Sequence, residues 1–231
     1  MNSALDRVKK VLNQCYVVLE LVDARFPQRS TRLNKMAKKK SKEVMLVITK
    51  SDLIKEPEKL ARKMNGFLFS AKTRRGKKAL LKHLEYLSEG EELKVGVVGR
   101  PNVGKSSLIN VLVGKKSAKT SPSAGYTKGE QWVRVAPNIL LIDSPGVITW
   151  NELTNDELLV EDALSIDKTD DPEGAALTLF RRYPHVLKRL KLGKEPLKEY
   201  AVRTGKLKKG GKPNTKEAAR MIIRRWQRGL I

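Results

Sequence analysis

The chain has 231 residues, and its 48 Lys and Arg residues outnumber its 25 Asp and Glu residues, so its net charge is +23 and its isoelectric point about 10.1. This charge favours a polyanionic partner such as nucleic acid, although a solvated basic surface has the same composition. One cysteine and two separated histidines exclude an internal disulfide and argue against zinc chemistry and Ser-His-Asp hydrolysis. We find no apolar run of membrane-spanning length and no secretory signal, so we expect no membrane partner and a cytoplasmic location.

Short apolar runs alternate with helix-like segments over residues 1–149, which is typical of βα units and a mainly parallel sheet. The pattern therefore predicts an α/β fold. We expect strands at residues 16–22, 44–49, 67–70, 93–98, 131–135 and 139–143, and helices at residues 31–40, 57–65, 77–87 and 105–113.

The last third of the chain differs in pattern and in charge. Apolar residues recur there at helical spacing, which predicts a small all-helical domain. Residues 151–173 hold 1 basic and 9 acidic residues, a net charge of −8, whereas residues 181–231 hold 17 basic and 3 acidic residues, a net charge of +14. We predict an α/β domain at 1–150, an acidic connection at 151–175 and a basic helical domain at 176–231.

A phosphate-loop pattern runs from Gly99 to Ser106, between a predicted strand and a predicted helix. An ordinary glycine-rich turn explains the glycines but not Lys105 and Ser106 at this spacing. Lys105 would approach the β and γ phosphates, and the Ser106 hydroxyl would bind Mg²⁺. Backbone N–H groups of the loop and of the helix N-terminus would face the phosphates. The predicted nucleotide contacts here are Asn102, Val103, Gly104, Lys105, Ser106 and Ser107.

Two further segments are candidates for the γ-phosphate side of the same site. Asp143 ends a predicted strand, where its carboxylate could bind Mg²⁺, partly through water, and the Gly146 N–H could reach the γ-phosphate; a surface turn would look the same in isolation. Thr127 is the best candidate for a threonine that contacts both Mg²⁺ and the γ-phosphate, with Thr120 as competitor and an inert loop threonine as the alternative. Lys105, Thr127 and Gly146 would stabilise the transition state, and no side chain is an obvious general base.

A base-reading signal lies much earlier in the chain, after the predicted strand 44–49. Asp52 could accept two hydrogen bonds from the guanine N1–H and exocyclic amine, which adenine cannot provide, although a helix-capping Asp is also common there. The aliphatic stem of Lys50 could cover the base. Two such signals at successive strand ends favour base recognition. The predicted contacts are Thr49, Lys50, Asp52, Ser70, Ala71 and Lys72, with the Ala71 segment supplying an N–H to guanine O6.

Together these motifs resemble those of the translation-factor-related GTPases, in which the phosphate loop precedes the base-reading motifs. Here the base-reading motifs come first, an order similar to that of the circularly permuted GTPases and, more closely, of the YlqF/RbgA-like family, which acts in assembly of the large ribosomal subunit. Residues 22–27, 208–213 and 218–229 also resemble segments of this family. The resemblance implies a P-loop GTPase domain with a circularly permuted, six-stranded, mainly parallel sheet, in which residues 77–92 bridge the original ends.

The resemblance also implies a function. The chain is expected to bind GTP and GDP, to hydrolyse GTP with Mg²⁺, and to act as a monomer on the large ribosomal subunit or its precursor. Thr49 stands where the family usually has Asn, which suggests a lower nucleotide affinity. Val147 stands where Ras-like enzymes have a water-orienting Gln, so hydrolysis should be slow without the ribosomal particle. Asn102 resembles the asparagine of potassium-activated GTPases and suggests a role for K⁺, with a turn-forming Asn as the alternative.

The basic C-terminal region is expected to bind ribosomal RNA through phosphate contacts. Trp226 suits packing better than base stacking. We expect movement at the γ-phosphate to reposition this region, because the segment after Gly146 leads into it. Two other readings stay open: a GTPase that acts on another RNA, and a GTP-binding RNA module with negligible hydrolysis. The candidate RNA contacts are Lys208, Lys209, Lys212, Arg220, Arg224 and Arg228.

Overall fold

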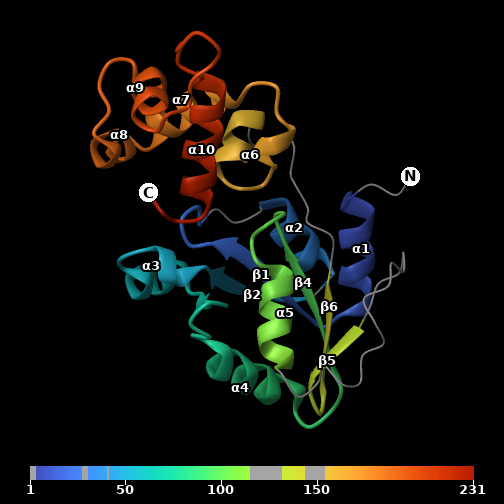
Figure 1. Ribbon diagram of the computed structural model, residues 1–231. Helices are drawn as coiled ribbons and strands as arrows, with labels where there is room; N and C mark the ends of the chain where they lie inside the picture. The colour runs from blue at the N-terminus through green and yellow to red at the C-terminus, as the bar shows by residue number, and fades with distance from the viewer. Residues whose placement is uncertain (1–3, 28–30, 41, 115–131, 144–153) are drawn as a thin grey trace. The chain divides into compact units, whose positions relative to one another are not determined.

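The computed structural model describes residues 4–27, 31–40, 42–114, 132–143 and 154–231. The chain forms two compact units, Met1–Ile148 and Thr149–Ile231, which are drawn in Figure 1. The division into the three functional regions proposed from the sequence stays a prediction.

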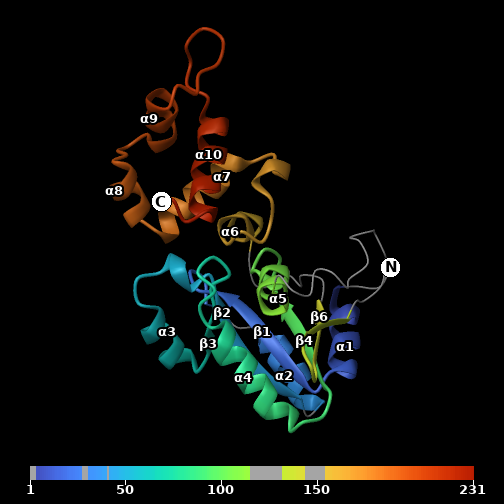
Figure 2. The ribbon, with the colours of Figure 1, turned by 60° about the horizontal axis from the view of Figure 1, so that its bottom comes forward.

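The first unit is built on a six-stranded sheet in the order β3-β2-β1-β4-β6-β5. All neighbouring strands pair in parallel except β5 and β6, which are antiparallel. Figure 2 shows β1 and β4 in the middle of the sheet. The predicted fold class is confirmed. The strands are β1 (Val17–Asp23), β2 (Glu43–Thr49), β3 (Phe67–Leu68), β4 (Leu93–Gly99), β5 (Trp132–Ala136) and β6 (Ile139–Asp143).

Strand β3 is shorter than the four residues expected from the sequence. Phe69 still donates its N–H to the Ile48 carbonyl at 2.8 Å, but its own carbonyl accepts from the Ser51 N–H at 3.1 Å. Ser70 then donates its N–H to the Arg75 carbonyl. The chain thus leaves the ladder after Leu68 because these backbone groups bond to the neighbouring loops.

Helices cover both faces of the sheet. The four helices predicted in this region are present as α2 to α5, and an additional helix, α1, precedes the first strand. Figure 1 shows α4 and α5 on the opposite side of the sheet from α1 and α2. A short 3₁₀ helix, η1 (Ser51–Leu53), follows β2. The helices are α1 (Ala4–Gln14), α2 (Thr31–Lys39), α3 (Pro57–Met64), α4 (Lys77–Ser88) and α5 (Lys105–Val113).

Helix α1 packs closely on β4 at Gly96. Val11, Leu12 and Cys15 are fully buried, and burial raises the pKa of the Cys15 thiol. A Cβ atom at Gly96 would lie 2.7 Å from Val11 Cγ1 and 2.9 Å from Cys15 Sγ. Only glycine therefore allows this helix to lie so near the strand.

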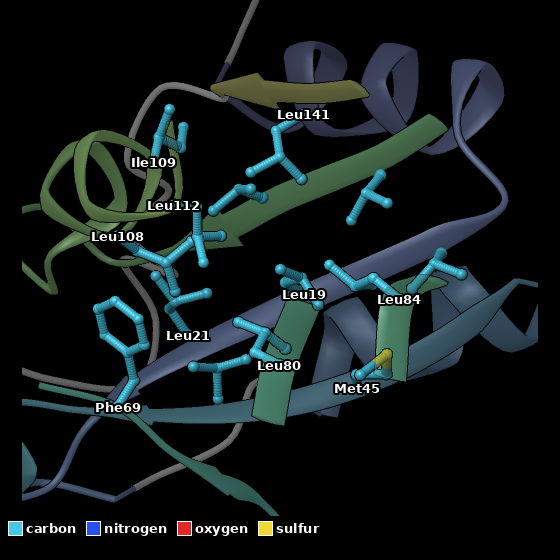
Figure 3. Packing of buried hydrophobic residues seen from close by; sticks show 14 of the residues in the cluster. Leu19, Leu21, Met45, Phe69, Leu80, Leu84, Leu108, Ile109, Leu112 and Leu141 are labelled. Carbon is cyan, nitrogen blue, oxygen red and sulfur yellow. The ribbon is translucent and has the colours of Figure 1, made fainter. Parts of the chain in front are cut away.

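The core lies in two layers, one on each face of the sheet. All seven residues of β1 are buried, as expected for a parallel strand covered on both sides. Because successive side chains point to opposite faces, Leu19 joins the layer beneath α4 and α5, and Val18 joins the layer beneath α1 and α2. Figure 3 shows Leu80 and Leu84 of α4 beside Leu19.

The regular elements described in the second unit are helices, and a loop between α9 and α10 contains an isolated antiparallel bridge between Leu207 and Pro213. Helix α10 packs against α7, α9 and α6. Part of the acidic segment belongs to this packed unit, since Leu158, Leu159 and Val160 of α6 are buried. Trp226 is 7% exposed and donates its Nε1–H to the Val160 carbonyl at 3.0 Å, which favours the packing role. The elements are α6 (Asn155–Val160), η3 (Ile166–Lys168), α7 (Pro172–Arg182), α8 (His185–Leu190), α9 (Pro196–Arg203) and α10 (Thr215–Gln227).

Across the described ranges, no helix combines the length and the apolar character that crossing a bilayer requires.

Candidate functional site

The predicted site residues that the structure describes lie near the carboxyl ends of parallel strands. Strands β3, β2, β1, β4 and β6 run in the same direction and end at one edge of the sheet, the edge where α/β sheets bind ligands. The base-reading segments follow β2 and β3, the phosphate loop follows β4, and Asp143 ends β6. Segments that are far apart in sequence thus meet on one edge.

The phosphate loop leaves β4 at Gly99 and enters α5 at Lys105. Asn102 and Gly104 have positive φ angles of 56° and 105°, which turn the chain sharply between strand and helix. A Cβ atom at Gly99 would lie 2.8 Å from the Leu21 carbonyl oxygen, so the loop begins in close contact with β1. The N-terminus of the nine-residue helix α5 follows directly. This arrangement is a ready anion site.

The Lys105 side chain is folded over the loop. The residue is only 8% exposed, and its Nζ donates to the carbonyl oxygens of Arg100 at 2.9 Å and Gly99 at 3.3 Å. The loop therefore fixes the ammonium beside the N-terminus of α5, where phosphate oxygens would be favoured.

Residue types that magnesium accepts as ligands occur at this edge of the sheet. Ser106 is exposed in the first turn of α5, and Asp143 pairs in register with Val97 of β4, close to the start of the loop. Hydroxyl and carboxylate oxygens are ligands that Mg²⁺ accepts while keeping several waters. Within the described ranges, no group of three or more His, Cys, Asp or Glu residues is arranged to hold a metal by itself. Thr127, Thr120, Gly146 and Val147 lie outside the described residues, so their roles stay predictions.

Thr49 links the base side of the site to the phosphate loop. Its side chain is buried, and Oγ1 lies 2.7 Å from the Val103 carbonyl oxygen and 2.9 Å from the Val22 carbonyl oxygen. The single hydroxyl hydrogen therefore lies between an acceptor on β1 and one on the loop. The sequence suggested that Thr in place of Asn weakens the brace; in the structure, Thr49 still contacts the loop directly. The expected lower affinity stays a prediction.

Asp52 is held by Ser70. Asp52 is exposed in η1 and accepts a hydrogen bond from Ser70 Oγ at 2.5 Å. Ser70 is fully buried, and its Oγ accepts from the Thr73 N–H at 3.2 Å. Ser70, predicted as a nucleotide contact, thus acts on Asp52 in this structure. Ala71 and Lys72 follow Ser70 in the turn after β3.

Sequence reasoning gave no chemical role to Asp23, which the structure places in a cluster with Arg25 and Lys50. Asp23 Oδ1 accepts from Arg25 Nε at 3.0 Å, and Oδ2 accepts from Arg25 Nη2 at 2.7 Å. Lys50 Nζ lies 3.0 Å from the same Oδ2. Burial favours the neutral carboxyl, but the hydrogen bonds from Arg25 and the charges of Arg25 and Lys50 outweigh it, so the pKa of Asp23 is lowered. The signal in the sequence was Asp23 at a strand end with Arg two residues later.

These features define a class. The sheet order, the phosphate loop on the central strand β4 and the base-side loops on β2 and β3 form a P-loop GTPase fold. Because the base-side strands β1 to β3 precede β4 in the chain, the fold has a circularly permuted order.

Comparisons with known proteins agree with this class. Residues 94–183 match the family described as 50S ribosome-binding GTPase. The chain is 37% identical, over 97% of its length, to a GTP-binding protein of Methanocaldococcus jannaschii, of which it covers 65%. It is 31% identical, over 96% of its length, to nuclear/nucleolar GTPase 2 of Arabidopsis thaliana, of which it covers 42%. The chain thus spans less than two-thirds of the length of either relative.

A solved structure supports the fold. GNP-bound YlqF from T. maritima aligns with a TM-score of 0.68 and 24% identity, over 98% of this chain and 94% of that one. Residues 94–183 are therefore similar to a GTPase family described as ribosome-binding, the chain is similar along its length to GTP-binding and nucleolar proteins, and its fold is that of YlqF.

Proposed function

We propose that the chain binds GTP and GDP at the sheet edge described above, hydrolyses GTP with Mg²⁺, and acts in assembly of the large ribosomal subunit. The observation that carries the proposal is the Thr49 contact with Val103, because it joins a guanine-reading segment to a phosphate loop in one site. The related YlqF has been solved with GNP and with GDP, and the relatives' names describe GTP-binding and nucleolar proteins.

Each group of site residues is proposed to contact a different part of the nucleotide. Backbone N–H groups of Asn102 to Ser107 surround the phosphates, and Lys105 supplies positive charge to them. Asp52 selects guanine, with Ser70 fixing its carboxylate and the Ala71 segment offering an N–H to O6. Ser106 and Asp143 would hold Mg²⁺, which neutralises phosphate charge when bound. Thr127 and Gly146 would contact the γ-phosphate.

Hydrolysis is proposed to be slow without the ribosomal particle, because Val147 cannot orient a water molecule as Gln does. We keep K⁺ as a proposed activator beside Asn102. The positive φ of 56° at Asn102 equally suits a turn-forming residue. Equal hydrolysis rates in sodium and potassium buffers, measured with ribosomal particles present, would remove potassium from the proposal.

We propose that the RNA contact lies on a lysine loop of the second unit, residues 206–213. Lys208 donates its N–H to the Lys212 carbonyl at 2.8 Å, and Gly211 donates its N–H to the Lys208 carbonyl at 3.1 Å. Lys208, Lys209 and Lys212 are exposed, so phosphates can approach them from several directions. The tight turn thus presents three lysines on one short loop.

The arginines of α10 are less available than the sequence suggested. Arg220 lies 3.9 Å from Glu217 and donates to the Thr169 carbonyl at 3.4 Å. Arg224 pairs with Asp167 and lies 3.6 Å from Glu217. Arg228 is exposed. We therefore favour the lysine loop and Arg228 over Arg220 and Arg224 as RNA contacts.

Asp52→Asn tests the nucleotide site most directly. An Asn amide can donate to the C2 carbonyl of xanthine, which replaces the guanine amine, so affinity should move from GDP to XDP. Titration of the wild type and Asp52→Asn with fluorescent GDP and XDP measures this. An unchanged preference for GDP would contradict the assignment of Asp52.

Co-sedimentation tests the biological partner. The chain is expected to act as a cytoplasmic monomer that binds large-subunit precursors more tightly with a non-hydrolysable GTP analogue than with GDP. Deletion of residues 151–231 should abolish this dependence on the nucleotide. Binding to another RNA instead of the precursor, or nucleotide-independent binding, would overturn the ribosomal proposal.

A further inference from the structure

We propose that Asp23 and Arg25 are positioning residues that hold Lys50 in the conformation required for nucleotide binding. The inference rests on the proposed function, because Lys50 is the side chain expected to cover the base. It assigns a role to a buried ion cluster at the end of β1 that the phosphate and base motifs do not explain.

The side-chain conformation of Lys50 has to be held by a contact with another residue. It sits between β2 and η1 with a left-handed backbone, φ 53° and ψ 33°, a conformation uncommon for a residue other than glycine. A lysine side chain has four rotatable bonds, and its restriction costs up to about 2 kcal/mol of conformational entropy. The salt bridge from its Nζ to Asp23 Oδ2, 3.0 Å long, fixes the far end of the chain. The aliphatic stem therefore crosses from β2 toward β1 along the site.

Asp23 is itself held rigidly. Arg25 donates to both carboxylate oxygens, and its backbone N–H donates to Oδ1 at 3.0 Å. The side chains of Asp23 and Arg25 are 8% and 7% exposed. The strand ends are also fixed, since Asp23 pairs in register with Thr49 and the Ala24 N–H donates to the Thr49 carbonyl at 2.9 Å. Arg25 thus holds Asp23, and Asp23 in turn holds Lys50.

The chemistry of the cluster favours a functional role. A buried ion pair gains little stability over apolar packing, because removing the charges from water costs about as much as their attraction returns. Here the cluster lies at the sheet edge that carries the nucleotide motifs, and one partner is the proposed base-covering lysine. Its effect is expected on nucleotide affinity, equally for GDP and GTP, because the base is common to both.

A double-mutant cycle tests the role through the coupling between two side chains. Fluorescent GDP is titrated against the wild type, Asp23→Asn, Lys50→Met and the double variant. Methionine keeps an unbranched stem but cannot form the salt bridge. We expect Asp23→Asn to weaken GDP binding about fivefold to tenfold, which corresponds to restoring part of the side-chain freedom of Lys50. In the Lys50→Met background, Asp23→Asn should have almost no further effect.

A purely structural cluster gives a different result. If Asp23 and Arg25 only fasten the strand end, Asp23→Asn weakens GDP binding equally in both backgrounds. That outcome would overturn the inference, as would unchanged binding by Asp23→Asn. Urea unfolding of each variant checks the folded state. Should Asp23→Asn not fold, Arg25→Lys replaces it in the cycle, because it removes the two-point contact while keeping the charge; the same coupling with Lys50→Met is expected.

Two controls separate this inference from the proposed function. Glu56→Gln changes an exposed carboxylate whose partner, Lys59, is also exposed, so GDP affinity should not change. If the wild type fails to bind GDP, both the proposed function and the inference are overturned. If the wild type binds GDP and the cycle is additive, only the inference is overturned.

Discussion

The hydroxyl of Thr49 lies 2.7 Å from the carbonyl oxygen of Val103, 54 positions later in the chain. One side chain thus couples the end of β2 to the phosphate loop after β4, with β1 between the two strands. In a permuted chain this contact joins the half that precedes the phosphate loop to the loop itself. The two halves of the proposed nucleotide site are therefore positioned by the sheet and not by adjacency in sequence.

Replacing Thr49 by Val should weaken GDP binding several-fold. Valine keeps the branched shape but leaves the buried Val22 and Val103 carbonyls without the hydroxyl, a loss of about 1 to 3 kcal/mol. Fluorescent GDP titration and urea unfolding measure the two effects. Thr204→Val is the matched control, since the Thr204 hydroxyl bonds the Tyr200 carbonyl in the second unit; it should leave GDP affinity unchanged. Equal affinities for wild type and Thr49→Val would contradict the brace.

Removing the three exposed lysines of the lysine loop should reduce both RNA affinity and its salt dependence. Each phosphate contact contributes about 0.7 to 0.9 to the slope of log K against log salt, so the Lys208→Ala, Lys209→Ala, Lys212→Ala triple variant should lose about 2 to 3. Binding to purified large-subunit rRNA across a salt series gives the slope. A triple variant with the wild-type slope would move the RNA contact elsewhere.

Arg220→Gln with Arg224→Gln provides the comparison for the lysine loop. These arginines interact with Glu217, Asp167 and the Thr169 carbonyl. Their replacement should lower the stability of the second unit and change the salt slope less than the lysine variant does. If the arginine variant changed the slope of log K against log salt more than the lysine variant does, α10 would be the main RNA surface.

Acid should destabilise the first unit partly through Asp23. The pKa of Asp23 is lowered in the folded protein, whereas an unfolded Asp has a pKa of about 3.9. The unfolded chain therefore binds the proton first as pH falls. The contribution of Asp23 to stability is complete above this unfolded value and is lost as pH falls through the folded value. Urea unfolding from pH 7 down to pH 3 should show a shallower loss for Asp23→Asn. Parallel curves for the two proteins would contradict this assignment.

Gly96→Ala should destabilise the protein by about 1 to 3 kcal/mol through overpacking. The added methyl group would lie 2.7 Å from Val11 Cγ1 and 2.9 Å from Cys15 Sγ, so α1 must move away from β4. Thermal or urea unfolding measures the loss. Combining the change with Val11→Ala removes the nearest atom and should recover part of it; no loss in Gly96→Ala would mean that α1 shifts freely.

Much of the fold could be predicted because its signals are local. Alternating apolar runs predicted the six strands, and the spacing of Gly99, Gly104, Lys105 and Ser106 predicted the turn from β4 into α5. The short length of β3 and the presence of helix α1 were not predicted, because the first depends on bonds to the neighbouring loops and the second on close packing at Gly96.

The sequence by itself determined the positive charge that suits polyanions, the phosphate-loop pattern, a candidate aspartate for guanine recognition, and the permuted order of these motifs. Only the tertiary structure decided which side chains act on one another. In the structure, Thr49 hydrogen-bonds the phosphate loop and Ser70 hydrogen-bonds Asp52. Asp23 forms an ion pair with Lys50, and Arg224 pairs with acidic residues. The physical reason is that residue types and their spacing are local properties of the sequence. Hydrogen-bond and ion-pair partners instead depend on which strand ends and helices the fold brings together.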